Sequence, residues 1–111
     1  TQLVCKEVLM SFESWQTTPD PKTIRQEKQK ARELRKSQWW KNRRACNICY
    51  YCERPTPAKK LTMDHVVPLA RGGRSIKSNL VPCCKSCNNQ KKNLLPIEWK
   101  EYLAFIGKNK E

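Results

Sequence analysis

Residues 49–52 read Cys-Tyr-Tyr-Cys, and residues 84–87 read Cys-Lys-Ser-Cys. Two residues between a pair of cysteines make a tight turn that aims both sulfurs at one point, so each pair can supply two ligands to one metal ion. A site with four protein ligands has no open coordination position, so the zinc it holds is structural. We therefore predict a structural, tetrahedral Zn²⁺ site whose ligands are Cys49, Cys52, Cys84 and Cys87.

The other cysteines leave alternatives open. Cys46 stands three residues before Cys49, and Cys83 is adjacent to Cys84, so both compete with the predicted ligands, while the role of Cys5 is undecided. The seven cysteines could also form three disulfides with one left over. Their clustering into Cys-x-x-Cys pairs favours metal binding, and from this we expect a reducing, cytoplasmic compartment.

The segment between the two cysteine pairs carries the residue types suited to chemistry. Asp64-His65 falls in a predicted strand at 60–67, a loop with Gly72-Gly73 follows, and a second short strand is predicted at 79–82. A helix is predicted from Lys85 to Asn93. The order is therefore strand, loop, strand, helix.

This stretch, from Cys49 to Asn93, resembles the HNH endonucleases. It joins an Asp-His pair, a Gly-Gly loop, an Asn-Leu strand and two cysteine pairs in the order of that family, and it covers about two fifths of the chain. The resemblance implies an α+β fold with a small ββα-metal (His-Me finger) core, a four-cysteine zinc site and flanking N- and C-terminal helices. Asn88 stands where the family name has its last histidine, which makes the chain an H-N-N variant.

The resemblance also implies metal-dependent hydrolysis of DNA phosphodiester bonds. His65, the single histidine of the chain, is expected to be the general base, because a reference pKa of about 6.5 lets neutral imidazole take a proton from water near neutral pH. Asp64 and Asn88 offer oxygen ligands for a catalytic Mg²⁺ or Mn²⁺ ion. Asn79 resembles the family's middle asparagine, which spans the loop and orients the imidazole.

One geometric requirement follows from strand geometry. Adjacent residues on a regular strand face opposite sides, yet Asp64 and His65 must both reach one site. We therefore expect the strand to end or bulge there.

Charge favours a nucleic-acid partner. Lys and Arg outnumber Asp and Glu by 23 to 10, which gives a net charge of +13. Attraction to anionic lipid is the weaker alternative, since no amphipathic lipid-binding helix is apparent. Contacts with the DNA phosphate backbone are predicted for a set of basic residues, each with a solvated surface position as its alternative: Arg71, Arg74, Lys77, Lys91 and Lys92.

The flanking segments complete the expected organisation. Residues 1–45 are predicted to form an accessory segment with a long basic helix that begins at Asp20-Pro21 and runs to about Arg44. Residues 46–95 form the nuclease core, and residues 96–111 a closing amphipathic helix that ends near Gly107. We expect one compact domain. No apolar run approaches the length of a membrane span and no secretory leader is recognised, so no membrane partner is expected.

Two rival functions remain beside the nuclease. The chain could be a zinc-binding nucleic-acid-binding module that is catalytically weak or inactive, because the neutral amide of Asn88 could bind metal more weakly than imidazole. It could also be an adaptor among the partner proteins of a phage packaging or restriction complex. A monomer has one active centre and should nick DNA, so cutting both strands would require a homodimer or two separate events.

Overall fold

The computed structural model describes residues 19–109, and the expectations for residues 1–18, including Cys5, lie outside that range. In chain order, with 3₁₀ turns labelled η, the chain forms α2 (Pro21–Arg35), α3 (Gln38–Arg44), η1 (Ala58–Lys60), β1 (Leu61–His65), η2 (Leu69–Arg71), η3 (Lys77–Asn79), β2 (Leu80–Cys84), α4 (Lys85–Lys91) and α5 (Pro96–Asn109). A β-hairpin followed by a helix, with flanking helices and a four-cysteine cluster, confirms the predicted α+β fold.

The two strands pair antiparallel, from Leu61 opposite Cys84 to His65 opposite Leu80. β1 is shorter than the predicted strand because it ends at His65, after which the Val66 amide still donates to the Asn79 carbonyl at 2.9 Å. β2 extends two residues beyond the predicted 79–82 and leads directly into α4.

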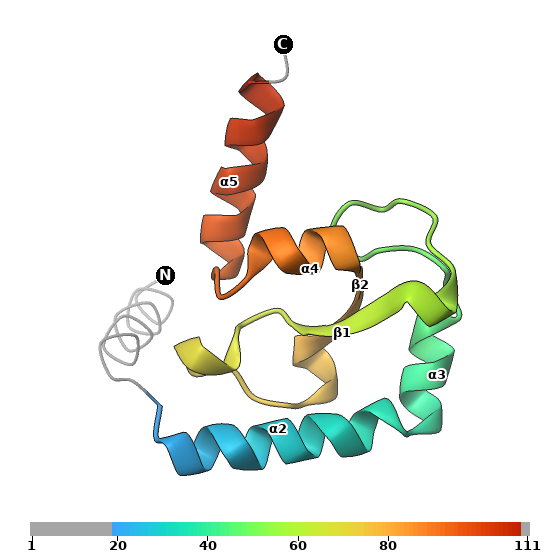
Figure 1. Ribbon diagram of the computed structural model, residues 1–111, viewed down its shortest axis with the longest axis vertical. Coiled ribbons are helices and arrows are strands. Elements are labelled where there is room, and N and C mark those ends of the chain that lie inside the picture. Colours follow the sequence, from blue (N-terminus) through green and yellow to red (C-terminus); the bar gives the residue numbers. More distant parts are fainter. Residues whose placement is uncertain (1–18, 110–111) are drawn as a thin grey trace, which may run out of the picture.

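The N-terminal helix begins as expected. Asp20 Oδ1 accepts a hydrogen bond from the Lys22 amide at 2.9 Å, and Pro21 occupies the first turn. The prediction of one helix to Arg44 is wrong, however. Ser37 Oγ accepts from the Trp40 amide at 3.3 Å and so caps a new helix, α3, which leaves the direction of α2 (Figure 1). A serine in N-cap position ends one helix and begins the next without glycine or proline.

The core lies between the hairpin, the cysteine turns and the start of α5. Cys49, Leu61, Cys83, Cys87 and Trp99 form one buried cluster. The rest of α5 extends away from the hairpin (Figure 1) and continues to Asn109, beyond the predicted end at Gly107. Within residues 19–109, no helix combines the length and the apolar character that crossing a membrane requires.

Candidate active site and metal centre

Four cysteine sulfurs converge at the base of the hairpin. The Sγ atoms of Cys49, Cys52, Cys84 and Cys87 all lie within 4.8 Å of one another, and those of Cys52 and Cys84 are 3.8 Å apart. A tetrahedral Zn²⁺ ion with bonds of about 2.3 Å places its sulfurs about 3.8 Å apart. The cluster therefore fits zinc.

In both cysteine turns a backbone amide also donates to the sulfur of the first cysteine. Cys49 Sγ accepts from the Cys52 amide at 3.5 Å, and Cys84 Sγ accepts from the Cys87 amide at 3.4 Å. These bonds place negative sulfur beside N–H dipoles, which suits metal ligands.

The two competing cysteines lie outside the cluster. Cys46 Sγ donates to the Ile48 carbonyl at 3.4 Å, and the buried Cys83 donates to the Cys84 carbonyl at 3.2 Å. The four predicted ligands are thus the ones that the fold brings together.

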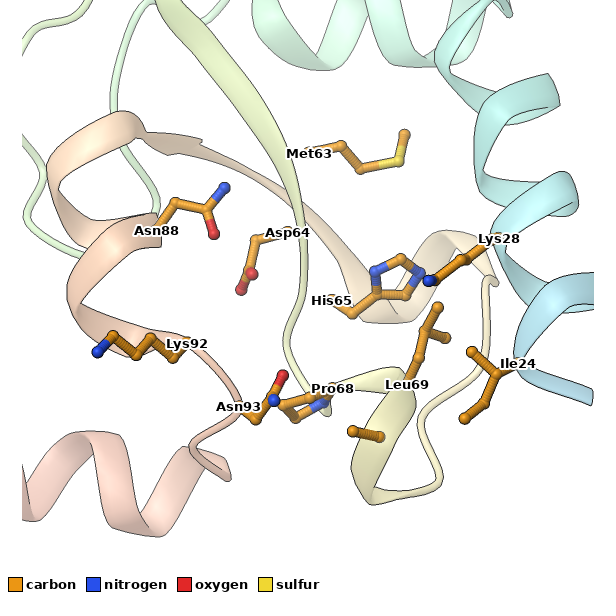
Figure 2. Close-up of a pocket in the computed structure, with 11 residues that line it drawn as sticks. Ile24, Lys28, Met63, Asp64, His65, Pro68, Leu69, Asn88, Lys92 and Asn93 are labelled. Atoms are coloured by element: carbon orange, nitrogen blue, oxygen red, sulfur yellow. The ribbon is translucent and has the colours of Figure 1, made fainter. Parts of the chain in front are cut away.

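A pocket of about 560 Å³ lies beside β1 and holds three of the four predicted catalytic side chains (Figure 2). Asp64 and His65 end β1, and Asn88 comes from the middle of α4. Lys28 of α2 and Lys92 at the end of α4 contribute positive charge to the same lining. The polar part of the pocket lining therefore consists of a carboxylate, an imidazole, the two amide side chains of Asn88 and Asn93, and two lysine side chains.

The strand geometry explains how adjacent residues share this pocket. Asp64 lies on the α4 side of β1, where it contacts Lys91, and His65 lies on the side of α2 (Figure 2). Because β1 ends at His65, no further residue of the strand separates the two side chains from the common space. The expected end of the strand at this point is confirmed.

The imidazole of His65 is held from the α2 side. Its Nε2 lies 2.9 Å from Ser75 Oγ, whereas Figure 2 shows the other ring nitrogen on the side of Asp64. Burial lowers the pKa of His65 below its usual 6.5, although the nearby Asp64 carboxylate opposes this and Arg35 reinforces it. The ring is therefore neutral at neutral pH.

One carboxylate oxygen of Asp64, Oδ2, already has two partners. Oδ2 accepts from the Tyr51 hydroxyl at 2.5 Å and from Lys91 Nζ at 3.1 Å. Burial and the adjacent carboxylate raise the pKa of Tyr51, so this phenol keeps its proton and donates it to Asp64. Oδ1 has no hydrogen-bond partner among residues 19–109, which leaves it free for a ligand.

The Asn88 amide is oriented by Thr62. The Thr62 hydroxyl donates its single proton to the Cys83 carbonyl at 2.9 Å, so toward Asn88 it can act only as an acceptor. The Asn88 atom 3.0 Å from it is therefore the donor Nδ2. This arrangement turns the Asn88 oxygen away from Thr62, and Figure 2 shows it on the side of Asp64. Asp64 and Asn88 thus present one oxygen each.

The side chain of Asn79 bonds to the backbone at both ends of the loop between Val67 and Arg74. Its Oδ1 accepts from the Val67 amide at 2.8 Å, and its Nδ2 donates to the carbonyls of Val67 at 3.1 Å and Arg74 at 2.9 Å. Gly73 tightens the same loop, because a Cβ there would lie 1.7 Å from the Val67 carbonyl oxygen. The side-chain hydrogen bond to the imidazole comes from Ser75, whereas the side-chain hydrogen bonds of Asn79 go to the loop backbone.

Lys91 is not on the surface where a phosphate contact was expected, and that prediction is wrong for this structure. Its side chain is 0% exposed, and Nζ contacts Asp64 and donates to the His65 carbonyl at 3.1 Å. The physical reason is helical spacing: Lys91 comes one turn after the buried Cys87 and shares its face of α4.

Of the remaining residues predicted to bind phosphate, three already contact another side chain. Arg71 Nη1 pairs with Glu98 at 3.0 Å, and Lys77 Nζ lies 5.7 Å from the centre of the Trp39 ring. Arg74 Nε lies 3.5 Å from a Glu27 oxygen while its side chain stays 62% exposed. Lys92 is exposed and lines the pocket. Lys92 is therefore the member of the set that lines the pocket.

Sequence reasoning missed several residues around the pocket. Glu27 is 3% exposed, and its Oε1 accepts from the Ser75 amide at 2.6 Å. The sequence does indicate that Glu27 is buried, because this residue falls between Ile24 and Ala31 on the apolar stripe of α2. An acidic residue on such a stripe indicates a buried partner. Tyr51 and Ser75 carried no comparable signal.

Comparison with protein families connects this geometry to a known group. Residues 49–101 match the model of a family described as HNH endonuclease. The match begins at the first zinc-ligand candidate, Cys49, and includes the pocket residues of β1 and α4, whereas α2 lies outside it. No curated protein matches the chain.

Proposed function

We propose that this chain, whose residues 49–101 belong to the HNH endonuclease family, hydrolyses DNA phosphodiester bonds with the help of a divalent metal ion. The observation that carries the proposal is the convergence of Asp64, His65 and Asn88 on one pocket beside the zinc-binding fold. Nucleic acid is the substrate class of this family, and the net charge of +13 supports a polyanionic substrate.

His65 is the proposed general base. A neutral imidazole with a pKa below 6.5 is ready to accept a proton at neutral pH, and the ring nitrogen that does not contact Ser75 is the one available for this purpose. The proton taken from an attacking water would be held there while the phosphodiester bond breaks.

Asp64 and Asn88 are the proposed metal ligands. Their two oxygens face a shared space and are hard donors, which fits Mg²⁺ or Mn²⁺ better than a thiophilic ion. Such an ion, when bound, would stabilise negative charge on the phosphoryl oxygens and the leaving oxygen. Lys91 and Tyr51 would fix Asp64 so that it offers only Oδ1.

The basic side chains around the pocket would hold the DNA backbone. Lys28 lies on α2 and Lys92 directly follows α4, and both line the same pocket. Contacts of this kind give affinity without sequence information. Arg74 and Lys77 could add phosphate contacts from the loop at the cost of their present partners.

A second candidate function has a specific observation in its favour. Lys91 is a fixed internal cation that already neutralises Asp64, and Asn88 is uncharged, so the metal site carries little net negative charge. A weak metal site would leave a zinc-stabilised DNA-binding module with little or no chemistry.

Incubation of supercoiled plasmid with the protein, with added Mg²⁺ or Mn²⁺ or with neither, tests the nuclease proposal. We expect nicked plasmid only when a divalent ion is present, and strong loss of cleavage in Asp64→Asn. Asp20→Asn is the matched control, because this exposed N-cap position accepts either residue. Intact plasmid under both ions, with DNA still bound, would refute the nuclease and favour the binding module.

A further inference from the structure

His65 contacts a hydroxyl whose own proton is already committed. Ser75 Oγ donates to the backbone carbonyl of Glu27 at 2.5 Å, and Ser75 is 4% exposed. A serine hydroxyl has one proton, so the Ser75 oxygen can act only as an acceptor toward His65. Nε2 of His65, at 2.9 Å, must then carry the proton.

The position of Ser75 is itself fixed from α2. Glu27 Oε1 accepts from the Ser75 amide at 2.6 Å, and Glu27 is held by Lys30 at 3.0 Å and by Arg74 at 3.5 Å. Burial opposes ionisation of Glu27, but the Ser75 amide and the two cations lower its pKa, so the carboxylate stays charged and keeps accepting. Two hydrogen bonds thus join Glu27 to Ser75 across 48 positions of sequence.

We propose that Ser75 and Glu27 are positioning residues that hold neutral His65 as its Nε2–H tautomer, so that Nδ1 is the basic nitrogen. The catalytic meaning of this inference rests on the proposed nuclease function, whereas the tautomer itself does not. Nδ1 lies on the side of Asp64 (Figure 2), where the metal-bound phosphate would be. The opposite tautomer would place a proton where an acceptor is needed.

Through Glu27, α2 takes part in positioning the general base although α2 lies outside the family match. Ser75 itself lies within residues 49–101, but without α2 it would lose the two contacts with Glu27 that fix its position. The orientation of His65 then depends on the packing of α2 against the loop.

Nitrogen NMR of the imidazole tests the tautomer directly, because His65 is the single histidine of the chain. The full-length protein labelled with ¹⁵N, without DNA or added Mg²⁺, should show a protonated Nε2 and an unprotonated Nδ1 at a pH above the His65 titration. A protonated Nδ1 in the wild-type protein would overturn the inference at once, with no variant needed.

Variants distinguish a role of Ser75 and Glu27 in positioning His65 from a role in folding alone. Ser75→Ala should lose the single-tautomer pattern and give mixed tautomers, while Ser78→Ala, an exposed serine of the same loop, should match the wild type. Glu27→Gln keeps the side-chain oxygen that accepts from the Ser75 amide, so it should retain the Nε2–H tautomer. Glu27→Ala removes this oxygen and with it the contact that positions Ser75, so it should give mixed tautomers. An unchanged tautomer in a folded Ser75→Ala protein would contradict the proposal.

Kinetics extend the test to function. Ser75→Ala should lower kcat by about 10- to 100-fold, as for other outer partners of functional histidines, with little change in KM. If the wild-type protein shows the Nε2–H tautomer but no cleavage, the nuclease proposal fails and the positioning inference stands. If it cleaves DNA with the opposite tautomer, the reverse holds.

Discussion

Lys91 and Asp64 form an ion pair inside the protein, with Nζ 3.1 Å from Oδ2 and with the lysine side chain 0% exposed. The same ammonium group donates to the His65 carbonyl, so one buried cation contacts both residues of the Asp-His pair. The pair fixes which of the two Asp64 oxygens is free.

Lys91→Met should be strongly destabilising. It removes the partner of a buried carboxylate, and breaking such a pair costs about 3–5 kcal/mol. Lys92→Met, at the neighbouring exposed position, should change the free energy of unfolding by less than about 0.5 kcal/mol. Denaturant unfolding measures both. Equal stability of the two variants would show that the ion pair contributes nothing beyond a surface charge.

Zinc should bind through the four clustered cysteines alone. Protein purified without chelator should contain one Zn²⁺ ion per chain, and Cys87→Ser should lose both the zinc and cooperative unfolding, because binding of structural zinc supplies folding free energy. Cys46→Ser removes a thiol outside the cluster and should keep the metal. Metal analysis and thermal unfolding provide the readouts, and loss of zinc in Cys46→Ser would refute this ligand set.

The acid limb of activity should lie below pH 6.5. His65 works as a base only when neutral, and burial lowers its pKa below 6.5, so kcat/KM should fall only as the pH drops through this lowered value. Asp64 and Glu27 raise the His65 pKa, while Arg35 and Lys91 lower it. Removing one cation, in Arg35→Gln, should therefore move the midpoint upward. A wild-type midpoint above 6.5 would contradict this account.

DNA binding should depend on salt through the pocket lysines. Lys92→Ala should weaken binding and reduce the slope of log K against log salt by about 1, as expected for the loss of one phosphate contact. Lys100→Ala removes an exposed charge on α5, away from the pocket, and should leave the slope unchanged. Fluorescence anisotropy across a salt series measures the slope, and equal slopes for the two variants would exclude Lys92 as a phosphate contact.

The parts of the fold that could be predicted depend on residues close together in the sequence. Two residues between cysteines, a hairpin-like order of strands, and an N-cap at Asp20 are local features, so the zinc cluster, the hairpin and the start of α2 followed from the sequence. The break at Ser37 did not follow from the sequence, because a serine can also sit inside a helix and bond back to a carbonyl of the preceding turn without ending the helix.

The contacts around the site were less predictable because they are long-range. Nothing local distinguishes the buried Lys91 from the exposed Lys92, since their burial depends on which face of α4 meets the hairpin. The pairing of Glu27 with Ser75 joins segments far apart in the chain. Such partners emerge only when the loop and α2 are packed together.

The most direct test of the central claim is the single-turnover rate of plasmid cleavage by His65→Ala, measured beside the wild type with saturating protein and Mg²⁺ or Mn²⁺. The account predicts a rate lower by about 100- to 10,000-fold, as expected for loss of a general base, with DNA affinity unchanged. Cleavage by His65→Ala at the wild-type rate would contradict it.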